Sequence, residues 1–433
     1  MKPLILSLLL MISLPLFAEE TLTLEDAWRI ALRDNPNEAV TRARFEQALA
    51  RVQLARSAYH PQLQASGNGA RVSFSDTQKA RNPLLDDSAE QFEAALRATF
   101  LLWDGGSRRS RLDAALSAAD SAQASLLEIR MDLLANVGRA FTSAQLAREN
   151  VRISTADAEF QNRQLQDIRR REAAGAASRA DRLNFDIRRL AAENAAVSAK
   201  ANYDTAMAAL TALLGLDADH PLPAPAPVDP DAPPHPAPKY AEAWNQAASQ
   251  LPALLRAQSQ IRAARANAAV ERGATRPTLA AFGDISASRT DDPAFSGEDI
   301  GNTLGIQIAW DLWDGGQRRA RTHEADWAVE EAAAGARDIE LQAQSQLANA
   351  ITAYIAAVRS EDITRETLEL TRENRDLVEA AFRAGQESLL RLNEAQRDYT
   401  TAESRAVQAR LTREQSWIDL LRAKGSLDPA LAQ

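Results

Sequence analysis

The chain contains no cysteine in its 433 residues. This absence excludes disulfide bonds, thiolate metal sites, a cysteine nucleophile and a lipid-bearing cysteine near the N-terminus. Beyond the N-terminus the chain also lacks any apolar run of the roughly eighteen residues that a membrane-spanning helix needs. Any later crossing of a membrane would therefore have to be made by strands.

Basic faces and clustered histidines are lacking as well. The net charge is −9, and the acidic and basic residues are interleaved, so no surface is predicted to neutralise phosphates and nucleic acid is not an expected partner. Charged pairs follow helix periodicity, as surface pairs do, and do not form paired catalytic carboxylates. The histidines show no metal-ligand spacing. They are His60, His220, His235 and His323. The sequence therefore predicts no catalytic residue, no metal site and no cofactor.

Residues 1–18 have the pattern of a secretory signal peptide. One basic residue, Lys2, precedes an apolar run from Leu4 to Leu14, and a small residue, Ala18, stands where a signal peptidase would cut. A buried helix or a membrane anchor is the alternative, but the run is too short to span a bilayer core of about 30 Å. The sequence therefore predicts export.

Alanine dominates the mature chain, whereas large aliphatic side chains are sparse. This composition provides few large apolar side chains with which to fill two globular cores. It suits long helices whose backbones pack closely.

Residues 19–216 and 240–425 form two repeats. The residues that align them are Trp28 with Trp244, Pro61 with Pro277, Trp103 with Trp313, and Gly175 with Gly385. The first two pairs are 216 positions apart and the last two are 210 apart. The change of six falls between the proline and the tryptophan, which predicts a longer loop at residues 75–90 of the first repeat.

Each repeat is predicted to open with helices. Thr23 can cap the first of them, with Asp26 three positions on. A second helix starts at Pro36, where the missing N–H costs little, and runs to His60 before Pro61 stops it.

The next segments, 61–103 and 277–313, read as β-hairpins. From Gln91 to Trp103, apolar and mostly polar residues alternate over the length of a tilted transmembrane strand. Residues 304–312 repeat the alternation, and residues 62–74 and 278–290 are the expected partner strands. Periodicity alone leaves open a soluble sheet whose apolar face covers a core. Export and the lack of other core material favour the membrane.

Two long helical hairpins follow, at 107–214 and 317–424. Their first helices contain almost no helix-breaking residue and would each be about 100 Å long. Apolar residues recur every three, four or seven positions, as in a coiled-coil seam. Gly175 and Gly385 break the helices, and Ser178 and Ser388 can cap the returning ones.

Residues 217–239 between the repeats hold nine of the eighteen prolines. This composition predicts an extended, semi-rigid linker, with a proline-rich ligand for a partner as the alternative. Residues 426–433 form a C-terminal tail.

Four strands cannot close a barrel, and open strand edges are not tolerated in lipid. Two copies would give eight strands with a filled interior, whereas three copies would give twelve strands and a lumen. A conduit therefore favours three.

At this level of detail the chain resembles the TolC-like outer-membrane efflux protein family. The matching features are the Leu-Thr-Leu-x-x-Ala opening at 22–27, Asn35-Pro36, Tyr59-His60-Pro61, both Trp-Asp-Gly-Gly segments and both glycine turns. The resemblance implies a mainly α, internally duplicated fold with a small β part. A homotrimer would form a 12-stranded β-barrel in outer-membrane lipid and a periplasmic α-barrel.

The resemblance also implies partners and sites. The duct would receive drugs, toxic compounds or a secreted polypeptide, as in type I secretion, from an inner-membrane pump or ABC transporter through a periplasmic adaptor (membrane fusion) protein. The turns at Gly175 and Gly385 would contact the adaptor. Gate candidates near the tip are Asp181, Asn184, Glu387, Arg391 and Glu394. Because Arg391 replaces the family's usual acid, an ionic latch from Asp181 or Glu394 to Arg391 is one reading, and a solvated charged face is the other.

The strand-to-helix junctions would be Trp103, Asp104, Gly105 and Gly106, and Trp313, Asp314, Gly315 and Gly316. Paired glycines allow backbone angles that other residues avoid, and the aspartates could accept N–H groups at the helix start. The alternative function is a periplasmic or surface coiled-coil structural protein. Such a protein would be extractable by salt alone.

Overall fold

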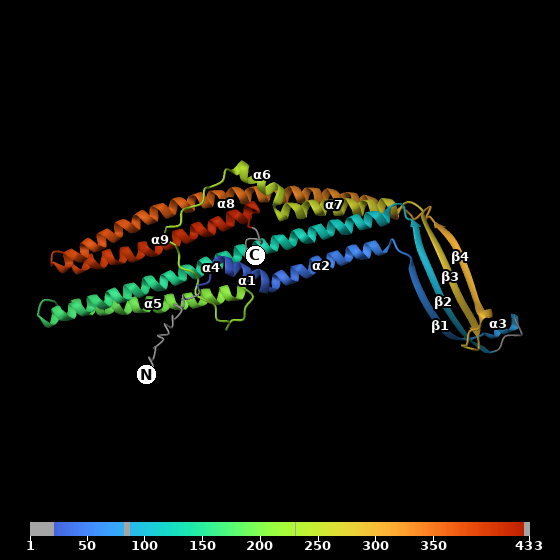
Figure 1. Cartoon of the computed structure of the whole chain (residues 1–433), viewed down its shortest axis with the longest axis horizontal. Coiled ribbons are helices and arrows are strands. Elements are labelled where there is room, and N and C mark those ends of the chain that lie inside the picture. Colours follow the sequence, from blue (N-terminus) through green and yellow to red (C-terminus); the bar gives the residue numbers. More distant parts are fainter. Residues whose placement is uncertain (1–20, 82–86, 230, 428–433) are drawn as a thin grey trace, which may run out of the picture. The chain divides into compact units, whose positions relative to one another are not determined.

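A computed structural model describes residues 21–81, 87–229 and 231–427. The fold class expected from the sequence is confirmed: the chain is mainly helical and carries one small antiparallel sheet (Figure 1). In the described ranges no helix is long and apolar enough to cross a membrane. The expected signal peptide lies outside the described residues, as do residues 82–86 of the long loop and the end of the C-terminal tail.

The same order of elements occurs twice along the chain. The first series is α1 (Leu24–Asp34), α2 (Pro36–Ser57), β1 (Gln62–Ser73), α3 (Asp76–Arg81), β2 (Ser88–Trp103), α4 (Ser107–Ala173) and α5 (Arg179–Leu213). The second is α6 (Tyr240–Gln250), α7 (Pro252–Gly273), β3 (Thr278–Thr290), the 3-10 turn η1 (Gly297–Asp299), β4 (Ile300–Ala309), α8 (Gln317–Arg383) and α9 (Leu389–Lys424). Among the described residues the two series differ in the loop between the hairpin strands, which holds α3 in the first series and η1 in the second.

The chain divides into two compact units, and each unit draws on both series. Unit 1 contains the described residues of 1–38, 130–247 and 346–433, and unit 2 contains those of 39–129 and 248–345. Unit 2 therefore holds the sheet and the helix ends next to it. Unit 1 holds both helix turns and the proline-rich segment.

The sheet of unit 2 has the strand order β1-β2-β3-β4, with every neighbouring pair antiparallel. The two hairpins share one register. Leu63 lies opposite Ala98 in the first, and Leu279, 216 positions later, lies opposite Ile308, 210 positions later, in the second. The paired residues 62–71 and 90–99 of the first hairpin therefore have their equivalents in 278–287 and 300–309 of the second.

One face of the sheet is mainly apolar and the other mainly polar, with Arg289 as an exception on the apolar face and Phe282 on the polar one. Opposed residues share a face, so the alternation along each strand adds up across the four strands. The apolar face carries Leu63, Phe92, Leu96, Ile285, Leu304, Ile306 and Ile308. The polar face carries Gln64, Asn68, Glu93, Gln307 and an ion pair in which Arg97 Nε lies 3.3 Å from Asp284 Oδ2.

β4 is shorter than expected, because the alternation predicted strand through residue 312 and β4 ends at Ala309. The strand ends there because the residues after Ala309 lack a partner strand. β3 begins at Thr278 opposite Ala309, so residues 310–313 have no partner strand on that side. In the first hairpin the equivalent residues 100–103 are strand because β3 pairs with them from the other side. β4 is an edge strand and has no such neighbour in one chain.

The core of unit 1 forms where the helices approach closely. Trp28 Nε1 donates a hydrogen bond of 2.8 Å to the carbonyl oxygen of Leu134 in α4. Gly138 of α4 faces α9, where a methyl group in its place would stand 2.8 Å from Ile418 Cδ1. The single glycine of the long helix thus allows close packing against α9.

The proline-rich segment is more than a spacer, because hydrogen bonds hold it to helices of unit 1 at two places along its length. Near its start, the Gln145 side chain of α4 donates to Ala226 O at 2.8 Å, and Arg148 donates to Pro225 O. Near its end, Tyr354 Oη of α8 donates to His235 O at 2.7 Å, and the His235 ring stacks on Trp417 of α9. We call residues 217–239 the strap.

A buried charge cluster lies under the strap. Arg410 and Arg413 of α9 both pair with Glu361 of α8, at 3.4 and 3.1 Å. Both guanidinium groups also donate to Ala232 O. The cluster therefore links α8, α9 and the strap at one point.

Candidate functional site

The first strand-to-helix junction is built around Asp104. Its carboxylate accepts hydrogen bonds from the backbone N–H groups of Gly106 and Arg108, at 3.3 and 2.6 Å, and so caps α4. Gly105 and Gly106 have φ of 69° and 93°, in the left-handed region where a side chain is disfavoured. The Arg108 side chain reaches back to Leu101 O at 2.7 Å, which ties the helix start to the strand end.

The second junction repeats this geometry. Asp314 accepts from the backbone N–H groups of Gly316 and Arg318, at 3.1 and 3.0 Å. Gly315 and Gly316 have φ of 67° and 92°. The carboxylate caps expected from the sequence are present in both repeats, and so are the positive backbone angles at all four glycines.

The two tip turns are also alike. Gly175 and Gly385 have φ of 72° and 73°, and nothing lies within 4 Å of the position that a side chain would take in either. After the first turn, Ser178 and Asp181 form a reciprocal capping box at the start of α5. After the second, Ser388 caps α9 by accepting from Arg391 N at 3.2 Å. Both turns are exposed, and no side chain packs on the glycine of either one.

The gate candidates lie just beyond these turns and do not form a single cluster in one chain. The carboxylate of Asp181 accepts from Ser178 Oγ at 2.7 Å and from Ser178 N at 3.1 Å. These hydrogen bonds, the side-chain one first, lower the pKa of Asp181. In the part of the chain that the structure describes, no ion pair joins Asp181 to Arg391.

Arg391 instead lies 4.0 Å from Glu394, one turn along the same helix. Both side chains are about half exposed, so this pair is a weak, solvent-screened contact. Asn184 and Glu387 are exposed. Sequence reasoning placed these residues near the tip, but it could not foresee that the carboxylate of Asp181 is engaged by its own helix cap.

Sequence reasoning missed the polar contacts that join α4 to α9. Ser404 Oγ donates to Asn150 Oδ1 at 3.0 Å, Gln396 donates to Asp157 at 2.8 Å and Gln415 donates to Thr142 at 2.7 Å. Because these residues stand on different helices, spacing within one helix gives no signal for them.

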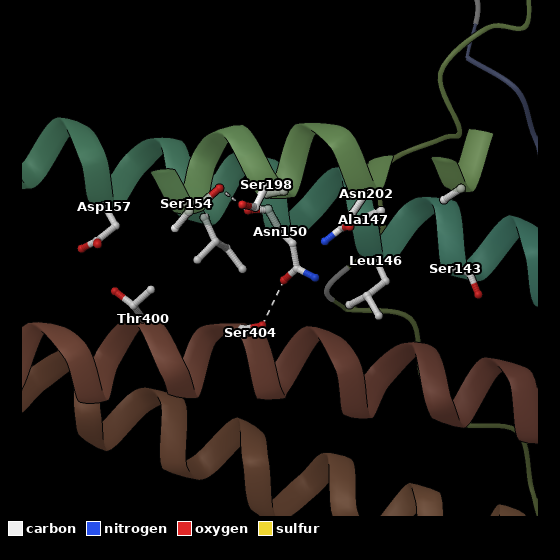
Figure 2. A pocket seen from close by; sticks show the side chains of 14 residues that line it. Ser143, Leu146, Ala147, Asn150, Ser154, Asp157, Ser198, Asn202, Thr400 and Ser404 are labelled. Atoms are coloured by element: carbon white, nitrogen blue, oxygen red, sulfur yellow. Dashed lines mark hydrogen bonds between the residues drawn. The ribbon is translucent and has the colours of Figure 1, made fainter. Parts of the chain in front are cut away.

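Residues of α4, α5 and α9, among them Asn150 and Ser404, line an open groove of about 650 Å³. Figure 2 shows Asn150 of α4 directed toward Ser404 of α9 across this groove. Small and hydroxyl-bearing residues line it, with Asp157 as the one carboxylate in the lining. Asn150 and Ser404 both line the groove, so water can reach the hydrogen bond between them.

A family model described as outer membrane efflux protein matches residues 28–216 and 243–426. The match covers both repeats and leaves out the strap. It includes both junctions and both tip turns.

Two curated relatives illustrate the likeness. Protein CyaE of Bordetella pertussis is 27% identical over 390 residues, which cover 90% of this chain and 81% of CyaE. The cobalt-zinc-cadmium resistance protein CzcC of Cupriavidus metallidurans is 30% identical over 204 residues, 46% of this chain and 45% of CzcC.

Among solved structures, the CmeC outer membrane channel of Campylobacter jejuni superimposes with a TM-score of 0.83. The likeness covers 94% of this chain and 87% of CmeC at 16% sequence identity, so it speaks for the fold. The family model confirms the resemblance drawn from the sequence, and the family is one of transport proteins. This chain belongs to the outer membrane efflux protein family and is an efflux channel protein of the outer membrane.

Proposed function

We propose that the chain is the exit duct of a tripartite export system. It would pass small molecules or a secreted polypeptide from an inner-membrane transporter and a periplasmic adaptor to the exterior. The observation that supports this proposal most strongly is the difference in polarity between the two faces of the sheet. A sheet with apolar side chains on one face and polar ones on the other fits a wall between lipid and a water-filled lumen.

Three copies complete the duct. The two edges of the sheet, β1 and β4, are open in one chain, and lipid does not tolerate open edges. Three chains supply twelve strands, a number that leaves a lumen. The long helices of α4, α5, α8 and α9 would then form the wall of a periplasmic tunnel.

The tip of the tunnel is the proposed adaptor contact and gate. Gly175 and Gly385 stand at exposed turns without neighbouring side chains, so a partner helix can approach their backbone. Asp181, Asn184, Glu387, Arg391 and Glu394 follow these turns and would surround the entrance. Because Arg391 is basic, the charged side chains around the entrance would be of mixed sign. An ion pair between Arg391 and Asp181 of a neighbouring copy would hold the entrance closed.

Membrane fractionation tests the proposed duct. The expected result is that the protein sediments with outer membranes, resists extraction by high salt and is released by detergent as a trimer. Release by salt alone would contradict the proposal. That result would support the alternative of a periplasmic or surface coiled-coil protein.

The latch has its own test. The double variant Asp181→Ala, Arg391→Ala is expected to raise single-channel conductance in planar bilayers relative to wild type. The matched control is Asn184→Ala, which removes a polar tip side chain without a charge. Unchanged closed-state conductance in the double variant would count against the latch.

A further inference from the structure

Each strand-to-helix junction is followed by a short basic segment. Residues 107–111 read Ser-Arg-Arg-Ser-Arg, and residues 317–321 read Gln-Arg-Arg-Ala-Arg. The first arginine of each segment belongs to the junction itself, because Arg108 and Arg318 each donate to a carbonyl oxygen near the end of the preceding strand. The junction geometry makes no use of the other two arginines of each segment.

The second arginines, Arg109 and Arg319, stand 210 positions apart and are both exposed. In the ranges that the structure describes, no hydrogen bond or ion pair holds either guanidinium group. These two side chains are therefore available to an anion from outside the chain.

The third arginines have acidic neighbours in their own chain. Arg111 lies 3.9 Å from the carboxylate of Asp104. Arg321 lines a groove between α7 and α8 together with Glu271 and Glu324. The second and third arginines of each segment thus differ in their surroundings, although only one residue separates them.

The backbone hydrogen bonds of β2 show how its neighbours are arranged around it. On the β1 side, Phe74 N donates to Asp87 O at 3.0 Å, and Asp87 has the parity of the polar-face residues. On the β3 side, Asp291 N donates to Glu90 O at 2.7 Å, and Glu90 has the parity of the apolar-face residues. Hydrogen-bonded pairs alternate along an antiparallel ladder, so the apolar-face residues before Leu101 direct their backbone polar groups toward β3. The chirality of L-residues then places β3 on the right and β1 on the left, seen from the apolar face with β2 running upward.

Helix α4 continues upward from β2, with α2 on its left and α7 on its right. Arg108 Nη1 donates to a carbonyl oxygen just after α2 at 3.2 Å, and Asp120 pairs with Arg262 of α7 at 3.0 Å. Seen along its own direction, a right-handed helix turns clockwise by about 100° per residue. From Arg108 on the α2 side, the next residue, Arg109, therefore points to the apolar-face side of the sheet. Arg111 points about 200° further on, to the polar-face side.

Exposed tryptophans mark the strand end of each junction. Trp103 pairs with Leu279 on the apolar face and is 44% exposed, and its equivalent Trp313 is 87% exposed. Tryptophans at the end of a lipid-facing strand lie at the level of the lipid headgroups. Because the second junction repeats the geometry of the first, Arg109 and Arg319 both follow such a tryptophan on the same side. An unpaired cation and an aromatic ring thus stand close together in the sequence at both places.

Resting on the proposed duct, which places the apolar face of the sheet in lipid, we propose that Arg109 and Arg319 each bind the phosphate of an anionic phospholipid in the periplasmic leaflet. A guanidinium group donates hydrogen bonds to phosphate oxygens in a fixed planar arrangement. An anionic headgroup is preferred to a zwitterionic one, because the cation of a zwitterionic headgroup offsets the attraction. Each chain holds two such lipids at equivalent places.

Tryptophan fluorescence measures which lipid occupies this surface, because Trp103 and Trp313 stand beside it. Phosphatidylcholine with brominated acyl chains should quench the fluorescence of the protein reconstituted in vesicles. Unbrominated phosphatidylglycerol should relieve the quenching as it displaces the brominated lipid. We expect the wild type to prefer phosphatidylglycerol about fivefold, the factor that one basic residue near an anionic membrane surface typically supplies.

Two double variants with the same change of charge test the assignment. Arg109→Gln, Arg319→Gln should bring the preference for phosphatidylglycerol to within about twofold of none, because the cations that select it are gone. Arg111→Gln, Arg321→Gln is the matched control. It should keep the preference of the wild type, because these arginines lie on the polar-face side of the sheet.

Each other outcome is decisive. An unchanged preference in the variant of residues 109 and 319, or an equal loss in both double variants, overturns the proposal. Loss of the wild-type preference on addition of inorganic phosphate at constant ionic strength would reveal a site for a free anion and overturn the lipid as the occupant. Wild-type protein that brominated lipid does not quench at all would contradict the proposed duct, because its tryptophans would then lie outside the membrane.

Discussion

Gly105 and Gly273 lie in backbone contact, with the position of a Cβ on Gly105 only 2.5 Å from the carbonyl oxygen of Gly273. This closeness brings the start of α4 against the end of α7 and leaves no room for a methyl group. Gly105→Ala should therefore destabilise the protein by about 2 kcal/mol or more, through overpacking and backbone strain. Thermal unfolding followed by circular dichroism would measure the loss. Gly106→Ala is the control, since its φ is also positive but its surroundings are open, and an equal loss in the two variants would refute the role of contact.

Glu361 holds two arginines in the interior of unit 1. Glu361→Gln removes the charge that both Arg410 and Arg413 face, and breaking such a buried pair typically costs about 3–5 kcal/mol. We expect a marked fall in the midpoint of chemical unfolding. Asp362→Asn is the matched control, because that carboxylate, next along the same helix, pairs with Arg365 at the exposed surface and should cost about 1 kcal/mol or less. Similar losses in the two variants would argue against a special role for the buried cluster.

The strap should become more mobile when the hydrogen bond between Tyr354 and His235, near its C-terminal end, is removed. Tyr354→Phe keeps the ring but deletes the hydrogen bond to His235 O, which contributes about 1 kcal/mol. Limited proteolysis should then cut within residues 227–239 faster than in wild type, while the helices remain protected. Tyr203→Phe serves as a control for loss of a tyrosine hydroxyl on another helix. Equal cleavage rates in the two variants and in wild type would show that the strap is held by other contacts.

The cap at the start of α5 should depend on pH. Hydrogen bonds from Ser178 lower the pKa of Asp181 below its ordinary value of 3.8. A carboxylate with a depressed folded-state pKa contributes its stability in full above the ordinary value and loses it as the pH falls through the folded one. The protection of the amide hydrogens at residues 178–182 against exchange, measured relative to the intrinsic exchange rate at each pH, should therefore fall below about pH 3.8 in wild type. In Asp181→Asn the exchange should be fast already at neutral pH, and a protection pattern identical to wild type would contradict the cap.

Local signals in the sequence located the helices and turns well. Thr23 caps α1 with Asp26, as the spacing predicted, because a cap needs only residues within one turn. The positive φ at Gly105 and Gly315 likewise follows from paired glycines after a capping aspartate. Both long helices in each repeat follow from long stretches that lack helix breakers.

What the sequence could not show depends on contacts between distant segments. The end of β4 at Ala309 depends on whether a neighbouring strand is present, and no pattern within residues 304–312 reports that. Gly105 is buried because α7, more than a hundred residues further along the chain, packs against it, whereas Gly315 is exposed because no described residue lies near it. The anchoring of the strap on Trp417 and Tyr354 is likewise a tertiary contact, invisible in a proline-rich composition.

Recording from planar lipid bilayers tests the central claim, that this chain forms a conducting duct through the outer membrane, most directly. Purified wild-type protein added in detergent should insert and produce discrete, repeated conductance steps, one for each inserted trimer. A protein that remains soluble after detergent removal and leaves the bilayer conductance at its baseline would contradict the account.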